Sequence, residues 1–223
     1  MKKLSLLLLI SLAGSLAFAN HITGGEMYYV LKSQSGNNYT YFVTLKLYRD
    51  CNAPPGSAEL EPFAAIAIFN NATNGLVVNN NVPKARQDTL QIGSPNPCII
   101  NPPVVCYQVA YYEFEVTLQG NAAGYTIAFQ RCCRIAGINN LLGSNNAGAT
   151  YTAQIPGTNV AAGAPANSSA HFTGADTVIV CANDAFTYDF GADDPDNTDS
   201  LSYFFCEAFT SIQNPPNPNP PLN

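Results

Sequence analysis

Residues 39–51, which read YTYFVTLKLYRDC, constrain the fold of this chain more than any other stretch. Large apolar side chains occupy every second position, namely Tyr39, Tyr41, Val43, Leu45 and Leu47. The other set of alternate positions includes the polar residues Thr40, Thr44, Lys46 and Asp50. Successive side chains of an extended chain point to opposite faces of a sheet, so this period of two predicts a strand with one buried face. The strand runs directly into Cys51, a candidate covalent anchor.

Similar apolar patterns recur along the chain and predict an all-β fold. We predict further strands at residues 27–31, 63–69, 76–78, 84–92, 104–119, 125–133 and 149–155. Turn-forming Asn, Gly and Pro residues separate them, and charged residues make up only 11% of the chain. This composition is typical of an extracellular β protein with many turns. We therefore expect residues 20–157 to form one β-sandwich domain.

A change of composition divides the chain after residue 157. Residues 158–169 are rich in Ala, Gly, Pro, Asn and Ser without periodicity, so we predict a linker there. Residues 170–223 carry three short apolar runs, 178–180, 185–190 and 201–205, which we predict to be strands of a second unit. A β-sandwich needs about seven strands. The second unit is therefore expected to be partial, either because the chain is truncated or because the unit itself is incomplete.

The N-terminus predicts export. Lys2 and Lys3 precede an apolar run that ends at Leu16, and an Ala-x-Ala cleavage site follows, so residues 1–19 read as a signal peptide. We expect a secreted or cell-surface protein with no transmembrane segment after cleavage. Without these two lysines, the 9 basic residues fall to 7 against 15 acidic ones. That acidic balance argues against nucleic acid as a partner.

Seven cysteines in an exported chain predict a disulfide framework. We predict a bond between Cys98 and Cys106, which enclose a short loop containing two prolines, and one between Cys181 and Cys206, which flank the strands of the second unit. Cys132 and Cys133 are adjacent on a predicted strand and point to opposite faces. Only one of them can meet Cys51, so we predict Cys51 paired with Cys132 or Cys133. The remaining cysteine would be free, intermolecular or paired with a residue beyond Asn223.

One acidic loop makes a candidate calcium site. Four carboxylates, Asp193, Asp194, Asp196 and Asp199, lie within seven positions of one another. Closely spaced oxygen ligands are what calcium binds, whereas an acidic turn exposed to solvent is the structural alternative. The loop is not an EF-hand, because the sixth position counted from Asp194 is Asp199 instead of Gly and the twelfth is Phe205 instead of Glu.

The sequence shows no catalytic machinery, and we predict that the chain is not an enzyme. A nucleophilic triad usually needs a histidine base, and the only histidines are His21 and His171. Glu113 and Glu115 share one strand face about 7 Å apart and could form a glycosidase pair, but solvated glutamates on a strand are the plainer interpretation.

Several segments together resemble a known family. In order they read HITGGEMYY, LKLYRDC, the loop from PC to VC that carries Cys98 and Cys106, YTIAFQRCCR, GATYTAQIPG and VIVCAND followed by DPDNTDSLSYFFC. Together they are similar to the N-terminal region of large gliding motility-associated cell-surface proteins. The resemblance implies immunoglobulin-like or cadherin-like modules, secretion and an adhesive surface role. The acidic loop is one residue longer than the family's usual DPDGDSL and lacks its glycine, and the family's C-terminal sorting domain is not present, which fits a truncated chain.

We therefore expect a secreted, disulfide-linked structural or adhesion protein whose partners are surface glycans or other cell-surface proteins. The alternative is a carbohydrate-binding module or accessory domain of a glycan-acting protein, since the many tyrosines could stack on sugars. Tyr111 and Tyr112 are the candidate positions for such stacking.

Overall fold

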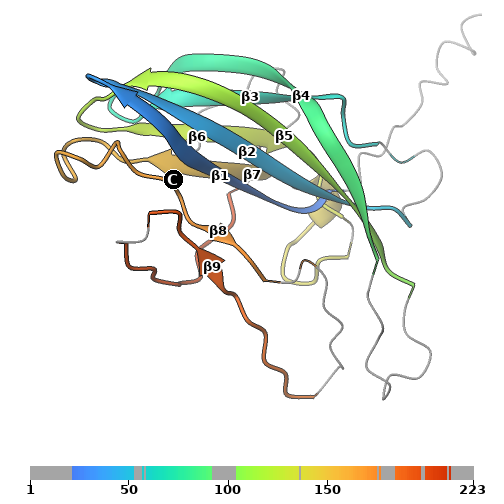
Figure 1. Ribbon diagram of the computed structural model, residues 1–223. Coiled ribbons are helices and arrows are strands. Elements are labelled where there is room, and N and C mark those ends of the chain that lie inside the picture. The colour runs from blue at the N-terminus through green and yellow to red at the C-terminus, as the bar shows by residue number, and fades with distance from the viewer. Residues whose placement is uncertain are drawn as a thin grey trace, which may run out of the picture.

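A computed structural model of the chain describes residues 22–52, 57, 59–91, 104–135, 137–174, 176, 184–196, 199–209 and 211. Within these ranges the chain is all-β apart from one short 3-10 helix, η1 (Ser144–Asn146) (Figure 1). The strands of the large sheet are β1 (Ile22–Ser35), β2 (Asn38–Asp50), β3 (Phe63–Asn70), β4 (Gly75–Gln91), β5 (Cys106–Gln119), β6 (Tyr125–Arg131) and β7 (Ala149–Ile155). A two-stranded sheet follows, made of β8 (His171–Phe172) and β9 (Ala192–Asp193).

The large sheet bends into a sandwich with immunoglobulin-like strand order. All its pairings are antiparallel, in the order β1-β2-β5-β4-β3-β6-β7. The layer β1-β2-β5-β4 and the layer β3-β6-β7 correspond to the ABED and CFG sheets of a constant-type immunoglobulin domain. The expected β-sandwich is therefore confirmed.

The core lies between the two layers and contains the apolar side chains that alternate along β2, as the sequence predicts. Along β2 every apolar side chain of the sequence pattern is buried, including Tyr41, Val43, Leu45 and Leu47 at 1% exposure or less. The facing layer contributes Ile66, Ile68, Ile127 and Ile155, which are equally buried. Burying a side chain of this size stabilises the fold by about 1.5–3 kcal/mol, so this cluster is the main source of stability.

Strand β4 differs from the prediction, which placed two separate strands at 76–78 and 84–92. The structure has one continuous strand that changes partner halfway along its length. Its first half pairs with β3 as far as Pro83, and its second half pairs with β5 from Lys84, with a register shift between Lys84 and Arg86. Proline has no backbone N–H to donate, and a bulge bends the strand, so the chain passes from one layer to the other at this point.

Two tyrosine hydroxyls tie strand ends together across the sandwich. The Tyr125 hydroxyl, at the start of β6, donates a hydrogen bond to the Gln119 carbonyl at the end of β5 (2.6 Å). This is the tyrosine corner of immunoglobulin-like domains. The Tyr29 hydroxyl on β1 donates to the Gln154 carbonyl on β7 (3.0 Å), which joins the two edge strands of the bent sheet.

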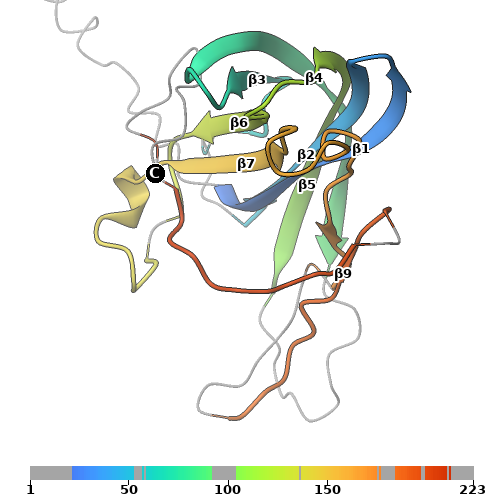
Figure 2. The same cartoon turned by 90° about the vertical axis from the view of Figure 1, so that its left-hand side faces the viewer.

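The predicted linker, 158–169, is packed against the sandwich. Ser168 Oγ accepts a hydrogen bond from the Leu31 backbone (3.1 Å), and Ser169 Oγ accepts one from the Tyr29 backbone (2.8 Å). The buried Tyr41 hydroxyl donates to the Pro165 carbonyl (2.5 Å). The chain after β7 therefore runs beside β1 before it reaches β8 and β9 (Figure 2).

The prediction of three strands in the second unit is wrong for the two that the structure describes. Residues 185–190 and 201–205 form no strand, and the predicted strand at 178–180 lies outside the described residues. The only pairing in this part of the described chain is the short β8–β9 ladder, His171 with Asp193 and Phe172 with Ala192. The apolar residues of these segments, such as Phe186 and Phe204, are exposed at 63% and 83%, so no packed layer holds them in strands.

Candidate functional site

An open cleft of about 570 Å³ lies on the outer face of the β1-β2-β5 layer. One wall comes from β1, the end of β2 and the start of β5. The other, the C-terminal wall, comes from the described residues between 172 and 190. The lining is mainly aromatic and acidic: Glu26, Tyr48, Tyr107, Phe172, Asp176, Tyr188, Asp189 and Phe190, with Thr23, Gly24, Gly25, Val105 and Gly174. A concave site that combines aromatic side chains with a few convergent polar groups is typical of ligand binding.

Asp176 fastens the C-terminal wall of this cleft to the sheet. Its carboxylate forms a salt bridge with Lys46 on β2, with Nζ and Oδ1 2.9 Å apart, and accepts a hydrogen bond from the Tyr48 hydroxyl (2.5 Å). Lys46 and Tyr48 are two positions apart, so both point to the outer face of β2. The Lys46 side chain is only 12% exposed, which shields this pair from solvent more than a typical surface salt bridge.

The environment keeps Tyr48 in its neutral, donating form. Burial, then the hydrogen bond to Asp176 and the negative charge of Asp176, together raise the pKa of Tyr48 well above 10.0. Ionising the phenol would place two negative charges in contact. Tyr48 therefore remains a hydrogen-bond donor to Asp176 at any physiological pH.

Further contacts hold the C-terminal wall of the cleft. Glu26 Oε1 accepts a hydrogen bond from the Phe172 backbone (2.7 Å), and the Tyr28 ring stacks on His171 with centroids 5.2 Å apart. Within the wall, the rings of Tyr188 and Phe190 meet edge to face at 4.7 Å. The cleft is thus formed by contacts between segments more than one hundred residues apart.

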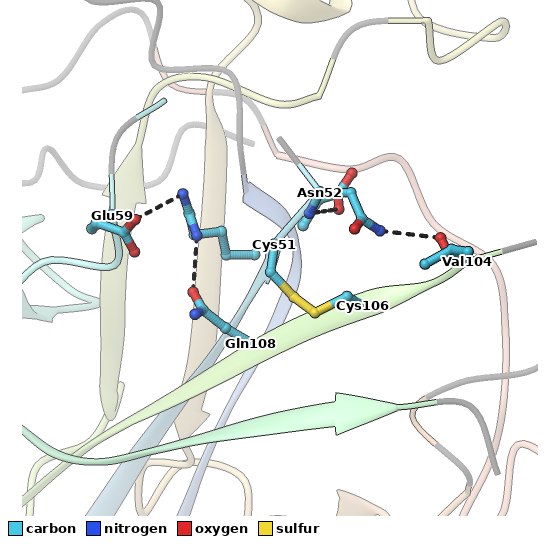
Figure 3. The surroundings of a disulfide bond; sticks show 8 residues. Cys51, Asn52, Glu59, Val104, Cys106 and Gln108 are labelled. Atoms are coloured by element: carbon cyan, nitrogen blue, oxygen red, sulfur yellow. Dashed lines mark hydrogen bonds and ion pairs between the residues drawn. A yellow bond between two sulfur atoms is a disulfide. The ribbon is translucent and has the colours of Figure 1, made fainter. Parts of the chain in front are cut away.

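A disulfide lies at one end of the sandwich and corrects the predicted pairings. Cys51, directly after β2, is bonded to Cys106 at the start of β5 (Figure 3). Neither the predicted Cys98–Cys106 bond nor a bond from Cys51 to Cys132 or Cys133 is therefore formed. The two strands are neighbours in the sheet, so the bond links adjacent strand ends in one layer. Cys98 itself lies outside the described residues.

Hydrogen bonds and an ion pair surround this disulfide (Figure 3). The Asn52 side chain donates to the Val104 carbonyl (3.1 Å), which links the chain on either side of the bond. The Arg49 guanidinium, only 6% exposed, contacts Gln108 Oε1 at 2.9 Å and Glu59 Oε1 at 3.1 Å. The strand end that reads LYRDC is therefore fixed by both covalent and polar contacts.

The other cysteines give one further bond. Cys132 and Cys133, which follow β6, are bonded to each other and not to Cys51. The adjacent Arg134 donates from Nε to the Gly148 carbonyl (3.0 Å) and from Nη2 to the Phe209 carbonyl (3.1 Å). Cys206 is exposed and forms no disulfide with another described cysteine. Because Cys181 lies outside the described residues, the predicted Cys181–Cys206 bond stays a prediction.

Three of the four predicted calcium ligands come together. Asp194, Asp196 and Asp199 each offer a carboxylate oxygen within 4.8 Å of the others, whereas Asp193 belongs to β9 and is not in this group. Calcium–oxygen distances of about 2.3–2.6 Å let oxygens at such separations share one ion, so this group fits calcium as part of a larger ligand set. Asp196 also accepts hydrogen bonds from the Ser168 backbone and hydroxyl, so the acidic loop is tied to residues 168–169.

The predicted sugar-stacking tyrosines do not form a site. Tyr112 is fully buried in the core, where its hydroxyl donates to the Glu61 carbonyl (2.7 Å). Tyr111 is on the opposite face, but the Arg86 guanidinium carbon lies 3.4 Å from the centroid of its ring and covers it. The aromatic residues that do line the cleft were not identified from the sequence, because they come from four distant segments.

No family model, no curated protein and no solved structure matches the chain. Over the described residues, no helix has the length and apolar character required to span a membrane.

Proposed function

We propose that this chain is a secreted cell-surface protein of structural or adhesion type, part of a larger gliding motility-associated surface protein. The observation that carries this proposal is the aromatic and acidic cleft on the outer face of an immunoglobulin-like layer. Such a site is built for contact with a ligand. The proposed activity is therefore binding without turnover of a substrate.

The disulfides support an extracellular location. The bond between Cys51 and Cys106 closes a loop with a sequence separation of 55. Disulfides persist in oxidising compartments and are rare in the cytosol. A covalently closed scaffold of this kind suits a protein that acts outside the cell.

The described C-terminal part supports a role in contact. Large apolar side chains there are strongly exposed, among them Phe172 at 56%, Tyr203 at 58% and Phe205 at 99%. Contiguous apolar surface usually marks an interaction site, and of these residues Phe172 lines the cleft. The C-terminal part of the described chain therefore supplies both a wall of the cleft and exposed apolar side chains that could contact a partner.

A cell-surface assay tests the proposal. Intact cells that produce the full chain are treated with protease, and the released peptides are compared with those of a cytosolic protein. We expect peptides of this chain to be released and deletion of its gene to reduce attachment or gliding. A chain that stays inside the cell, or a deletion strain that attaches and glides normally, would overturn the proposal.

A further inference from the structure

We infer that the cleft on the outer face of β1, β2 and β5 binds a neutral oligosaccharide. This inference names the ligand class of the proposed contact site and so rests on the proposed function. The volume of about 570 Å³ lies within the range of small-molecule sites and leaves room for a short oligosaccharide.

The aromatic part of the lining suits the faces of sugar rings. A pyranose has apolar C–H faces and a rim of hydroxyl groups. Tyr188 and Phe190 form an edge-to-face pair with centroids 4.7 Å apart, which fixes their rings relative to each other. Tyr107 on β5 lines the opposite wall. Rings on two walls of one cleft can therefore pack against the faces of a sugar.

The Glu26 and Asp189 carboxylates of the cleft can accept hydrogen bonds from the hydroxyl groups at the rim of a sugar ring. Glu26 and Asp189 each use one oxygen to accept a backbone N–H, from Phe172 (2.7 Å) and Gly191 (2.8 Å) respectively. These bonds hold each carboxylate in place. Its second oxygen has no hydrogen-bond partner among the described residues and can accept one from a sugar hydroxyl. Hydrogen bonds to an ionised acceptor are about twice as strong as neutral ones.

The charges around the cleft disfavour a cation at one end only, beside Lys46, and leave Glu26 and Asp189 without an ion pair to another described residue. Aromatic rings with carboxylates could also hold a quaternary ammonium group. However, the third carboxylate, Asp176, is neutralised by the Lys46 ammonium 2.9 Å away. That ammonium also lies 5.2 Å from the centroid of the Tyr48 ring. The Lys46 side chain therefore already occupies the position that a ligand cation would take over this ring. A second cation would be repelled there.

Calorimetry and ligand-observed NMR on the full chain test the inference. The probes are neutral trisaccharides of β-linked glucose, α-linked glucose, mannose, galactose and N-acetylglucosamine, with tetramethylammonium and trilysine as cationic probes. We expect one sugar class to bind. Tyr188→Ala should weaken that binding about tenfold or more, the factor that corresponds to about 1.4 kcal/mol. Tyr188→Phe keeps the ring and should retain most of the affinity, and Asp189→Asn should weaken it.

Tyr203→Ala is the matched control, since Tyr203 is an exposed tyrosine of the same C-terminal part and does not line the cleft. It should leave sugar affinity unchanged, and circular dichroism of every variant should show the wild-type fold. The inference is overturned if none of the trisaccharides binds, if only the cationic probes bind, or if Tyr188→Ala and Tyr203→Ala bind sugar equally.

The two proposals can fail separately. If Tyr188→Ala cells lose attachment while no trisaccharide binds, the contact function stands and the sugar assignment is wrong. If a trisaccharide binds and Tyr188→Ala abolishes that binding while gene deletion leaves attachment and gliding normal, the sugar site stands and the proposed surface function is wrong.

Discussion

Gly25 on β1 lies directly against the ring of Tyr151 on β7. A Cβ atom at position 25 would stand 2.8 Å from Tyr151 Cε1 and 2.8 Å from the Lys46 carbonyl oxygen. Only glycine leaves room for the two edge strands of the bent sheet to approach in this way. This contact, with the Tyr29–Gln154 hydrogen bond, brings the two layers together along one side of the sandwich.

Gly25→Ala is therefore expected to destabilise the fold. The new methyl group must displace a ring and backbone atoms, and overpacking of this kind costs about 1–3 kcal/mol. Gly24→Ala is the matched control, because its Cβ would meet nothing nearer than Tyr48 Cδ2 at 3.8 Å. Urea unfolding of both variants checks the prediction, and equal stability of the two would contradict the described packing.

The tyrosine corner predicts a loss of stability in Tyr125→Phe. The change removes the hydrogen bond to the Gln119 carbonyl and leaves that acceptor without its partner. A single hydrogen bond contributes about 0.5–1.5 kcal/mol, so we expect a decrease of about 1 kcal/mol in the free energy of unfolding. Tyr111→Phe is the comparison, since the Tyr111 hydroxyl makes no hydrogen bond to another described residue. A corner variant as stable as the wild type would show that this bond contributes nothing.

The buried tyrosines predict a loss of stability at high pH. Burial raises the pKa of Tyr29 from 10.0 to about 12 and raises that of Tyr41 as well. Above pH 10 the unfolded phenol loses its proton before the folded one, so the folded state binds more protons. The stabilising contribution of Tyr29 is complete below pH 10 and is lost as the pH rises through 12.

Urea unfolding at several pH values between 9 and about 12 measures this effect. Each fully shifted group contributes about 1.4 kcal/mol per pH unit. Tyr29→Phe should therefore reduce the steepness of the fall, whatever its stability at pH 7. The same change at exposed Tyr203 provides the reference slope. If Tyr29→Phe and the wild type show the same pH dependence, the burial of this hydroxyl is not what the structure describes.

The acidic loop predicts stabilisation by calcium. If Asp194 and Asp199 hold the ion with Asp196, calcium at about one hundred times its Kd adds about 2.7 kcal/mol to the free energy of unfolding. Asp194→Asn should remove most of this gain, while Asp193→Asn, outside the group, should keep it. Asp196 is a poor choice for this test because it also holds Ser168. Calorimetry that shows no heat, together with an unchanged melting temperature, would contradict the calcium site.

The sequence predicted those parts of the fold that depend on local pattern. The strands β2 and β7 lie where the period of two placed them, because each has one face against the core. The crossing of β4 between layers was missed, since the pattern near Pro83 reads as an interruption and only its partners on β3 and β5 show that the strand continues.

Features that depend on long-range contacts could not be read from the sequence. Cys51 meets Cys106 because β2 and β5 are neighbours in the sheet, an order that no spacing of cysteines reveals. The cleft likewise needs Asp176 to reach Lys46 across 130 positions. The one local signal is the pair Tyr188 and Phe190, two positions apart, which lies within the strand predicted at residues 185–190.

The disulfide between Cys51 and Cys106 is the most direct link between the fold and the proposed location. The chain-entropy model gives a loop with this sequence separation of 55 a stabilisation of about 4 kcal/mol. Changing both cysteines to alanine should lower the free energy of unfolding by about this amount.

Non-reducing peptide mapping of the chain recovered from the outside of intact cells tests the central claim most directly. It should yield one disulfide-linked pair of peptides that contains Cys51 and Cys106. Recovery of both cysteines as free thiols, or of Cys106 linked to Cys98, would contradict an exported scaffold closed between β2 and β5.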